Sequence, residues 1–321
     1  MPGVPPSGYA YLGPAGTFTE MALLQVPAAS KGERVACPSV QAALDAVRSG
    51  EVQAAMVPME NSVEGGVPAT IDGLTGGDPL VVVREALVPI SFVLAAGPGT
   101  TLADVHRIST HPHAWAQCRG WLAVNLPEAV YVPGLSTAGA AEGLSRRALP
   151  GDGGTATYDA ALCAEIAARQ CGLVVLAQEV GDNPTAVTRF VLVAKPGPPP
   201  PPTGSDKTSI VAYQPEDRPG GLLELLEQFA ARGINLVRIE SRPTGDALGQ
   251  YCFAMDAEGH IAEARMAEAL MGLHRFCSQV KFLGSYPRAE KVLTRVLPGT
   301  TDRAFADARA WVDRLREGRI D

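Results

Sequence analysis

Short apolar runs, separated by polar turns and by stretches of helical periodicity, fill the first part of the chain. Runs bounded by glycine, proline or polar clusters predict strands, and a repeat near 3.6 residues predicts helices. The predicted strands span residues 9–12, 52–57, 80–85, 88–95, 108–110, 130–132 and 173–177. A capping segment at 17–20 predicts the start of one helix. Further helices are predicted at 40–49, 114–122, 136–147 and 159–171. This alternation favours a largely parallel sheet with helices on both faces.

The pattern changes after residues 195–205, KPGPPPPPTGS, which are typical of an extended and semi-rigid linker. Beyond it, strands are predicted at 208–213, 234–240, 248–255 and 277–284, with helices at 219–232 and 261–273 and a turn at 243–246. The order is βαββαβ, as in a ferredoxin-like module. The first helix is predicted to turn Leu222, Leu223, Leu225, Leu226 and Phe229 inward. A tail helix is predicted at 302–316.

These patterns predict a domain organisation. A break near Leu80 divides the first part into two α/β lobes, about 1–83 with 178–194 and about 84–177, with a cleft between them. The linker is assigned to 195–206, the βαββαβ module to 207–287 and the tail to 288–321. A length of 321 residues is consistent with two or three domains.

Composition narrows the function classes. The net charge of -7 without any Lys/Arg run argues against nucleic acid as a partner. The six cysteines form no C-x-x-C pair, so they predict small core residues, not disulfides or a zinc site. The N-terminus resembles no signal peptide, and Arg84 with Glu85 interrupts the most apolar stretch, 79–96. We therefore expect a cytoplasmic protein without a membrane span.

The segment DNPTAVTRFVLV, residues 182–193, carries the strongest chemical signal. Thr188, Arg189 and Phe190 stand where a polar loop meets an apolar strand. A buried Arg is costly unless an anion pairs with it, so this pattern favours a site for a negatively charged, oxygen-bearing ligand. The alternative is an edge strand whose Arg extends to water.

Other candidate groups follow predicted strands. GPAGTFTE, with Thr17 at a helix start, and the turn at Ser136 can each offer backbone N–H groups to an anion, or can simply be capped turns. Glu60, Asn61 and Ser62 follow a buried strand. Open α/β sheets place ligand groups at such strand ends, so these groups are expected to converge on the cleft. His111 and His113 lack a third ligand at metal spacing, so no metal site is predicted.

The ordered motifs GPAGTFTE, VPMENSVEG, STH with AQC, LSTAGAAE and DNPTAVTRF resemble the prephenate dehydratase family. RPGGLLELL and IESRP resemble an ACT regulatory domain. The resemblance implies an α/β fold, with a two-lobed periplasmic-binding-protein-like catalytic domain and a ferredoxin-like ACT domain. It implies conversion of prephenate to phenylpyruvate, water and carbon dioxide without a cofactor or metal. An arogenate dehydratase, or a non-catalytic ligand sensor of the same architecture, is the alternative.

The resemblance also implies residue roles. Thr188 is expected to be essential and Arg189 to pair with a substrate carboxylate. The expected substrate-binding residues are Thr17, Glu60, Asn61, Ser62, Ser136, Thr137, Ala138 and Phe190. Loss of carbon dioxide and hydroxide yields an aromatic ring, and a hydroxyl donor such as Thr188 can stabilise the departing hydroxide. Glu60 is a rival proton donor. Many relatives carry glutamine where this chain has His113, which leaves the role of that position open.

The ACT resemblance implies a homo-dimer or homo-tetramer that binds L-phenylalanine between paired modules and is inhibited by it. The implied allosteric residues are Gly220, Gly221, Leu222, Leu223, Asn235, Leu236, Glu240, Ser241, Arg242 and Pro243. The helix start at 218–222 can take a carboxylate on physical grounds alone. Relatives often read G-A-L at 220–222, and the second glycine here is expected to loosen the helix start slightly. A passive oligomerisation domain is the alternative.

Overall fold

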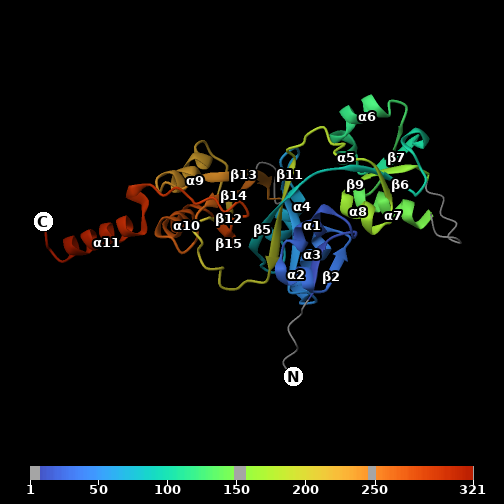
Figure 1. Cartoon of the computed structure of the whole chain (residues 1–321). Coiled ribbons are helices and arrows are strands. Elements are labelled where there is room, and N and C mark those ends of the chain that lie inside the picture. Colours follow the sequence, from blue (N-terminus) through green and yellow to red (C-terminus); the bar gives the residue numbers. More distant parts are fainter. Residues whose placement is uncertain (1–7, 148–156, 245–250, 321) are drawn as a thin grey trace, which may run out of the picture. The chain divides into compact units, whose positions relative to one another are not determined.

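Residues 8–147, 157–244 and 251–320 are described by a computed structural model (Figure 1). The chain divides into two compact units. The N-terminal unit comprises Met1–Thr70 and Ala86–Leu192, and the C-terminal unit comprises Ile71–Glu85 and Val193–Asp321. The predicted organisation assigned residues 71–83 to the first lobe, whereas this division groups them with the C-terminal module.

The first sheet has the strand order β2-β1-β3-β11-β5, with β4 paired to β3. Its strands are β1 Tyr9–Leu12, β2 Arg34–Cys37, β3 Ala54–Asn61, β4 Gly65–Gly66, β5 Val81–Pro89 and β11 Val187–Ala194. The helices of this part are α1 Phe18–Leu24, α2 Pro27–Lys31, α3 Val40–Ser49 and α4 Pro68–Thr75. β1 runs parallel to β2 and β3, whereas β4 is antiparallel to β3. The central strands β3 and β11 are therefore neighbours although 126 residues separate Asn61 from Val187 in sequence number.

The second sheet has the order β10-β6-β9-β7-β8. Its strands are β6 Val93–Ala96, β7 Arg107–Thr110, β8 Val130–Pro133, β9 Ala160–Cys163 and β10 Val174–Ala177. The helices here are α5 Pro112–Gln117, α6 Arg119–Asn125, α7 Thr137–Arg147 and α8 Glu165–Gln170, with a 3₁₀ turn η1 at Leu102–Asp104. β7 is parallel to β8 and β9, but β6 is antiparallel to β9 and β10. The sheet is thus mixed, and not largely parallel as predicted.

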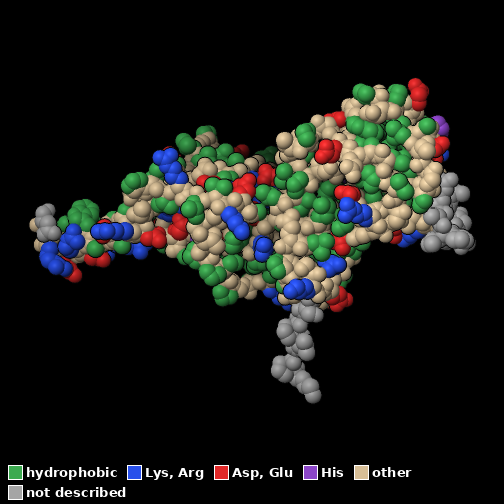
Figure 2. Space-filling view, viewed as in Figure 1, with side chains coloured by type: hydrophobic (Ala, Val, Ile, Leu, Met, Phe, Trp, Pro, Cys, Tyr) green, Lys and Arg blue, Asp and Glu red, His purple; other side chains and the backbone are tan. Residues whose placement is uncertain are grey.

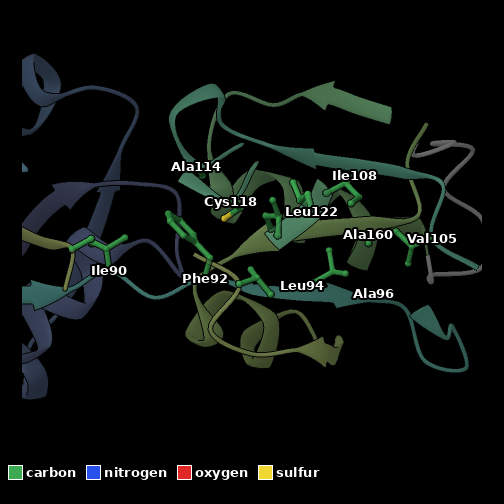
Figure 3. Close-up of a cluster of buried hydrophobic side chains, with 13 residues drawn as sticks. Ile90, Phe92, Leu94, Ala96, Val105, Ile108, Ala114, Cys118, Leu122 and Ala160 are labelled. Carbon is green, nitrogen blue, oxygen red and sulfur yellow. The ribbon is translucent and has the colours of Figure 1, made fainter. Parts of the chain in front are cut away.

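An apolar core fills the second lobe. Phe92 directly before β6, Leu94 of β6, Ile108 of β7 and Leu122 of α6 are buried together (Figure 3), and Leu162 of β9 belongs to the same cluster. The aromatic ring of Phe18 from α1 packs edge-on against Phe92, with the ring centroids 5.6 Å apart. This core positions the strand ends of the second lobe.

Three predicted elements are wrong in type or extent. The predicted helix 159–171 begins instead with the buried strand β9, and only Glu165–Gln170 is helical. Short apolar runs do not distinguish a buried strand from a buried helix, which explains the error. The predicted helix 114–122 is two helices, because the Asp182 carboxylate accepts from the N–H groups of Gly120 and Trp121 at 2.8 and 2.9 Å and caps α6 separately. The strand predicted at 88–95 is split between β5 and β6.

The C-terminal unit contains the βαββαβ order that was predicted. Its elements are β12 Asp206–Tyr213, α9 Gly221–Ala230, β13 Leu236–Pro243, β14 Tyr251–Glu258, α10 Ala264–Phe276 and β15 Gln279–Pro287. The sheet order is β13-β14-β12-β15 with antiparallel pairs, which confirms the ferredoxin-like fold. A 3₁₀ turn η2 at Pro298–Thr300 precedes the tail helix α11 Asp302–Arg316. The predicted turn at 243–246 and the start of the strand predicted at 248 lie partly outside the described residues.

The apolar face of α9 differs from the prediction. Leu225 and Phe229 are buried as expected, but Leu222 and Leu223 are 40% and 59% exposed. The helix begins only at Gly221, so these two leucines lie in its first turn, ahead of the turn that packs on the core. An exposed apolar surface results at the start of α9.

The cysteines, the length of the helices and the distribution of surface charge complete the description of the fold. The cysteines are free, and Cys37, Cys118, Cys163 and Cys252 are buried as predicted. In the part of the chain that the structure describes, no helix combines the length and apolar character needed to cross a membrane. On the face seen in Figure 2, acidic and basic side chains are interspersed.

Candidate active site

A cavity of about 370 Å³ lies in the N-terminal unit, among residues from both lobes. This volume is in the range of small-molecule sites. Its polar lining comprises Thr17, Thr19, Asn61, Glu64, His111, His113, Gln117, Ser136, Thr137 and Thr188. Phe18, Ile90, Phe92, Leu135 and Phe190 contribute apolar surface. The cavity therefore combines an apolar wall with a small set of hydrogen-bonding groups.

Thr188 of β11 and Asn61 of β3 form the central polar contact of this cavity. The Asn61 Nδ2 donates to the Thr188 Oγ1 at 2.7 Å, and Thr188 is only 7% exposed. The Asn61 Oδ1 accepts from the N–H groups of Val63 and Glu64 at 2.8 and 3.1 Å, which sets the orientation of the amide. The Thr188 oxygen accepts this hydrogen bond, and the hydroxyl proton can be donated to an acceptor in the cavity.

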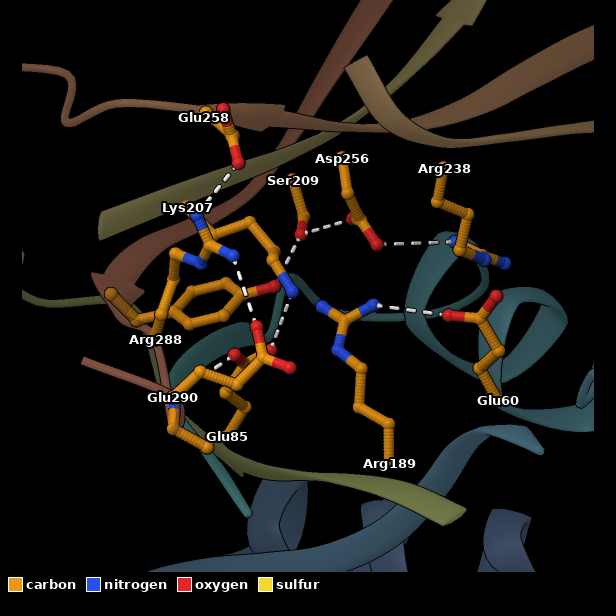
Figure 4. Close-up of polar contacts among 12 residues, drawn as sticks. Glu60, Glu85, Arg189, Lys207, Ser209, Arg238, Asp256, Glu258, Arg288 and Glu290 are labelled. Atoms are coloured by element: carbon orange, nitrogen blue, oxygen red, sulfur yellow. Dashed lines mark hydrogen bonds and ion pairs between the residues drawn. The ribbon is translucent and has the colours of Figure 1, made fainter. Parts of the chain in front are cut away.

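Arg189 lies on the other face of β11. Successive strand residues alternate in direction, so Thr188 and Phe190 face the cavity while Arg189 does not. Arg189 is only 6% exposed. Its guanidinium lies 3.7 Å from the carboxylate of Glu60 (Figure 4). Glu60 does not line the cavity either. In the structure the Glu60 carboxylate is an anionic partner of this buried Arg, and the pairing of Arg189 with a substrate carboxylate stays a prediction. The alternative of an Arg extended to water is wrong.

Ser62 and Thr17 hold the turns beside the cavity. The Ser62 Oγ accepts from the Val187 N–H at 3.0 Å, and the Ser62 N–H donates to the Val187 carbonyl at 2.9 Å. Ser62 therefore ties β3 to β11 and does not itself line the cavity. Thr17, which does line it, caps α1 by accepting from the Glu20 N–H, while the Glu20 carboxylate accepts from the Gly16 N–H at 2.7 Å.

The second predicted turn, at the start of α7, also reaches the cavity. The Ser136 Oγ caps the helix by accepting from the Gly139 N–H at 2.9 Å. Ser136 and Thr137 line the cavity, whereas the side chain of Ala138 is buried in the core. The N–H groups at this helix start lack intrahelical acceptors, so they can receive an anion.

Glu64 and Gln117 are cavity residues that the sequence did not single out. The Glu64 carboxylate pairs with the His113 Nδ1 and accepts from the Gln117 Nε2 at 2.8 Å. These contacts join the first lobe to α5 of the second. Both residues lie inside motifs quoted for the family resemblance, VPMENSVEG and AQC, and that position was the available signal.

Burial favours the neutral form of the His111 side chain. Its Nδ1 accepts from the His113 N–H at 3.3 Å, so the proton of the neutral ring is on Nε2. Burial lowers the pKa of His111, and the neighbouring His113 lowers it further, against an opposing effect of Glu64. No cluster of three or more metal-ligating side chains occurs among the described residues.

The predicted allosteric residues fall into two groups in the C-terminal unit. Gly220, Gly221, Leu222 and Leu223 form the start of α9, where Gly220 adopts a φ of 84° that favours glycine. Leu236, Glu240, Ser241, Arg242 and Pro243 lie on the edge strand β13, and Asn235 directly precedes it. The Arg242 guanidinium donates to both oxygens of Asp72, at 2.8 and 2.7 Å.

A two-lobed α/β unit with a polar cavity of small-molecule size, followed by a ferredoxin-like module, defines the class: a small-molecule-binding protein with an appended second module. Family models give the same division. Residues 9–198 match the model for prephenate dehydratase, and residues 208–275 match the model for the ACT domain. The chain belongs to the prephenate dehydratase family.

Individual relatives extend over nearly the full length. A prephenate dehydratase of Amycolatopsis methanolica is 45% identical, and the match covers 97% of this chain and 99% of the relative. The crystal structure of prephenate dehydratase from Arthrobacter aurescens in complex with L-Phe is 56% identical, with a TM-score of 0.90 and coverage of 97% and 99%. The prephenate dehydratase of Staphylococcus aureus, at 23% identity and a TM-score of 0.72, covers 87% of this chain and 99% of its own and shares the fold.

Proposed function

We propose that the cavity at Thr188 is where this member of the prephenate dehydratase family converts prephenate to phenylpyruvate, water and carbon dioxide. The observation that carries the assignment is the hydrogen bond from Asn61 to Thr188 at the cavity wall. It occupies one acceptor site of the hydroxyl, whose proton is then available to a substrate oxygen in the cavity.

The chemistry needs help mainly for the departing hydroxide. The ring C–O bond breaks with its electron pair on oxygen, the bond to the ring carboxylate breaks, and the electrons released complete the aromatic ring. Hydroxide takes up a proton to leave as water. A donor aimed at this oxygen stabilises its developing negative charge by roughly 3 kcal/mol. Thr188 is that donor in our proposal, and the neutral His111 is a second donor in the same cavity.

The two substrate carboxylates need donors other than cationic side chains. In the part of the chain that the structure describes, no Lys or Arg lines the cavity. We therefore propose that the N–H groups at the start of α7, at Thr137 and Ala138, receive a carboxylate. We assign Arg189 and Glu60 a positioning role behind the cavity wall. For Glu60 this role takes the place of the predicted role as a rival proton donor.

Substitution of Thr188 tests the assignment. We expect Thr188→Ala to lower kcat by about a hundredfold or more in a prephenate assay for phenylpyruvate, because the donor is lost. Thr188→Ser keeps a hydroxyl and is expected to retain much of the activity. Near-normal turnover by Thr188→Ala, with an unchanged melting temperature, would contradict the proposal.

We further propose that L-phenylalanine binds the ACT module at Gly220–Leu223, Asn235–Leu236 and Glu240–Pro243 and inhibits the enzyme. The L-Phe complex of the A. aurescens relative supports this, since that chain is 56% identical. The relatives' names favour prephenate over arogenate as substrate, and an enzyme over a non-catalytic sensor. The predicted division into a catalytic domain to 194, a linker to 206, an ACT domain to 287 and a tail remains part of the proposal, as does a cytoplasmic location.

A homo-dimer or homo-tetramer is also proposed. Val237 and Ile239 on the edge strand β13 and Tyr251 on the neighbouring β14 are 41%, 46% and 46% exposed. Leu222 and Leu223 are exposed on α9. An unpaired edge strand with apolar side chains favours pairing with a second copy of the module.

A further inference from the structure

One acidic side chain lines the cavity. Among the described lining residues, Glu64 is the sole Asp or Glu. Its N–H donates to the Asn61 Oδ1 at 3.1 Å, and the same Asn61 donates to Thr188. The turn that orients Thr188 therefore also sets the backbone position of this carboxylate.

Both carboxylate oxygens of Glu64 are engaged by donors from α5. The Gln117 Nε2 donates to Oε1 at 2.8 Å, and the His113 Nδ1 contacts Oε2. A protonated Nδ1 donates to the carboxylate whether the imidazole is neutral or charged. Each oxygen of Glu64 thus already meets one protein donor, at a site where 33% of its side chain is exposed.

Prephenate and arogenate differ at the group such a carboxylate would recognise. Prephenate carries a ketone in its side chain, and arogenate carries a protonated amine at the same carbon. An ammonium group in the cavity is favoured by an anionic acceptor, whereas a ketone needs donors only. In this cavity the acceptor for an ammonium group is Glu64.

We infer that the His113–Glu64 pair determines substrate specificity by withholding the cavity carboxylate from an ammonium group. The keto acid prephenate is favoured over the amino acid arogenate because His113 and Gln117 occupy Glu64. This inference rests on the proposed function and assigns to His113 the role that the sequence left open.

The test measures kcat/KM for prephenate and arogenate side by side. In His113→Ala one oxygen of Glu64 is released, and we expect the arogenate-to-prephenate ratio of kcat/KM to rise by about tenfold. The double variant His113→Ala with Glu64→Gln removes the released charge, and its ratio is expected to return to the wild-type value. His113→Gln keeps a donor and is expected to leave the ratio nearly unchanged.

Controls separate this effect from damage to the fold. His106→Ala removes an exposed histidine of the same lobe that does not line the cavity, and it is expected to leave the ratio and the melting temperature unchanged. The side chain of His113 is 65% exposed, so its truncation is expected to be tolerated.

Two results would overturn the inference. One is an unchanged ratio in a folded His113→Ala protein that still converts prephenate. The other is a raised ratio that persists in the double variant, because the effect would then not depend on Glu64. Lack of prephenate turnover in the wild-type protein would instead contradict the proposed function itself, and with it this inference.

Discussion

The pKa of His111 depends on its surroundings in the fold. His111 is the N-cap of α5, accepting from the His113 N–H through Nδ1, and it lines the cavity. Burial lowers the pKa of His111 below the ordinary value of 6.5. The ring therefore stays neutral in the folded protein at pH values where the unfolded chain already takes up a proton.

Stability is expected to fall as the pH drops below about 6.5, partly through this residue. Above that pH both states hold a neutral ring, so the stabilisation is fully present. Below it the unfolded state binds the proton first, and stability decreases until the lowered folded pKa is passed. His111→Asn keeps a capping acceptor but does not titrate in this range. Its melting temperature is expected to drop less than that of wild type between pH 7.5 and 5.5. Parallel drops in the two proteins would contradict this account.

Two neighbouring strands, β3 and β11, carry the active-site chemistry at the scale of elements. On the cavity face they present Asn61 and Thr188, and on the opposite face they present Glu60 and Arg189. The ion pair and the Ser62–Val187 hydrogen bonds hold the two strands in one register. The distance from Asn61 to Thr188 depends on that register, because a slip of one residue would turn each side chain to the other face.

Arg189→Lys is therefore expected to be damaging without any contact to substrate. A lysine keeps the charge but cannot reproduce the planar fork at a buried position. We expect kcat to fall by about tenfold or more with a smaller change in KM, together with a lower melting temperature. Arg146→Lys provides a matched control, since Arg146 forms an exposed pair with Glu142 on α7. Wild-type kcat in Arg189→Lys would refute the positioning role.

For the whole molecule, the helix α4 is one of three elements, with β5 and β11, along which the chain passes from one unit to the other. It begins two residues after Gly66, the last residue of β4, and ends in the C-terminal unit. There Asp72 pairs with Arg242, Arg242 lies 4.0 Å from Glu240, and Glu240 pairs with Arg238, which is 3.7 Å from Asp256. Figure 4 shows the inner part of this network, where Asp256 also bonds Ser209. Three of its members lie in or next to the IESRP motif.

This network predicts a route for control by phenylalanine. If the ligand binds at Glu240–Pro243, it competes with or reorders the Arg242–Asp72 contact at the end of α4. Asp72→Asn is expected to raise the half-inhibitory concentration of phenylalanine by about five- to tenfold, within the usual range of allosteric coupling. Turnover without phenylalanine is expected to stay at the wild-type level, as in the control Asp313→Asn on the tail helix. Unaltered inhibition in Asp72→Asn would exclude this route.

Assembly is tested on the exposed edge of the same module. Ile239→Lys places a charge on the apolar surface of β13, which disfavours burial against a second copy. We expect the mass measured by analytical ultracentrifugation to shift toward the monomer. Val130→Lys, at a 58% exposed position on β8, serves as a control and is expected to keep the wild-type mass. A wild-type mass for Ile239→Lys would argue against an interface at this edge.

Local patterns were sufficient for the features that depend on near neighbours in sequence. The caps at Thr17 and Ser136, the helix α3 and the βαββαβ order of the C-terminal unit were all predictable. Each rests on hydrogen bonds or periodicity within a few residues, which the sequence alone contains. The motifs likewise indicated the family and brought Thr188 and Asn61 forward as site residues.

Only the tertiary structure decided which partner each side chain meets. Asp182 caps a helix 62 residues earlier, and Asn61 meets Thr188 across 127 residues. Arg189 faces Glu60 and not the cavity, and Glu64 meets His113 from the other lobe. Periodicity shows that a residue is buried or that two neighbours point in opposite directions. It does not show which face of a strand meets the cavity, because that follows from how distant strands pair.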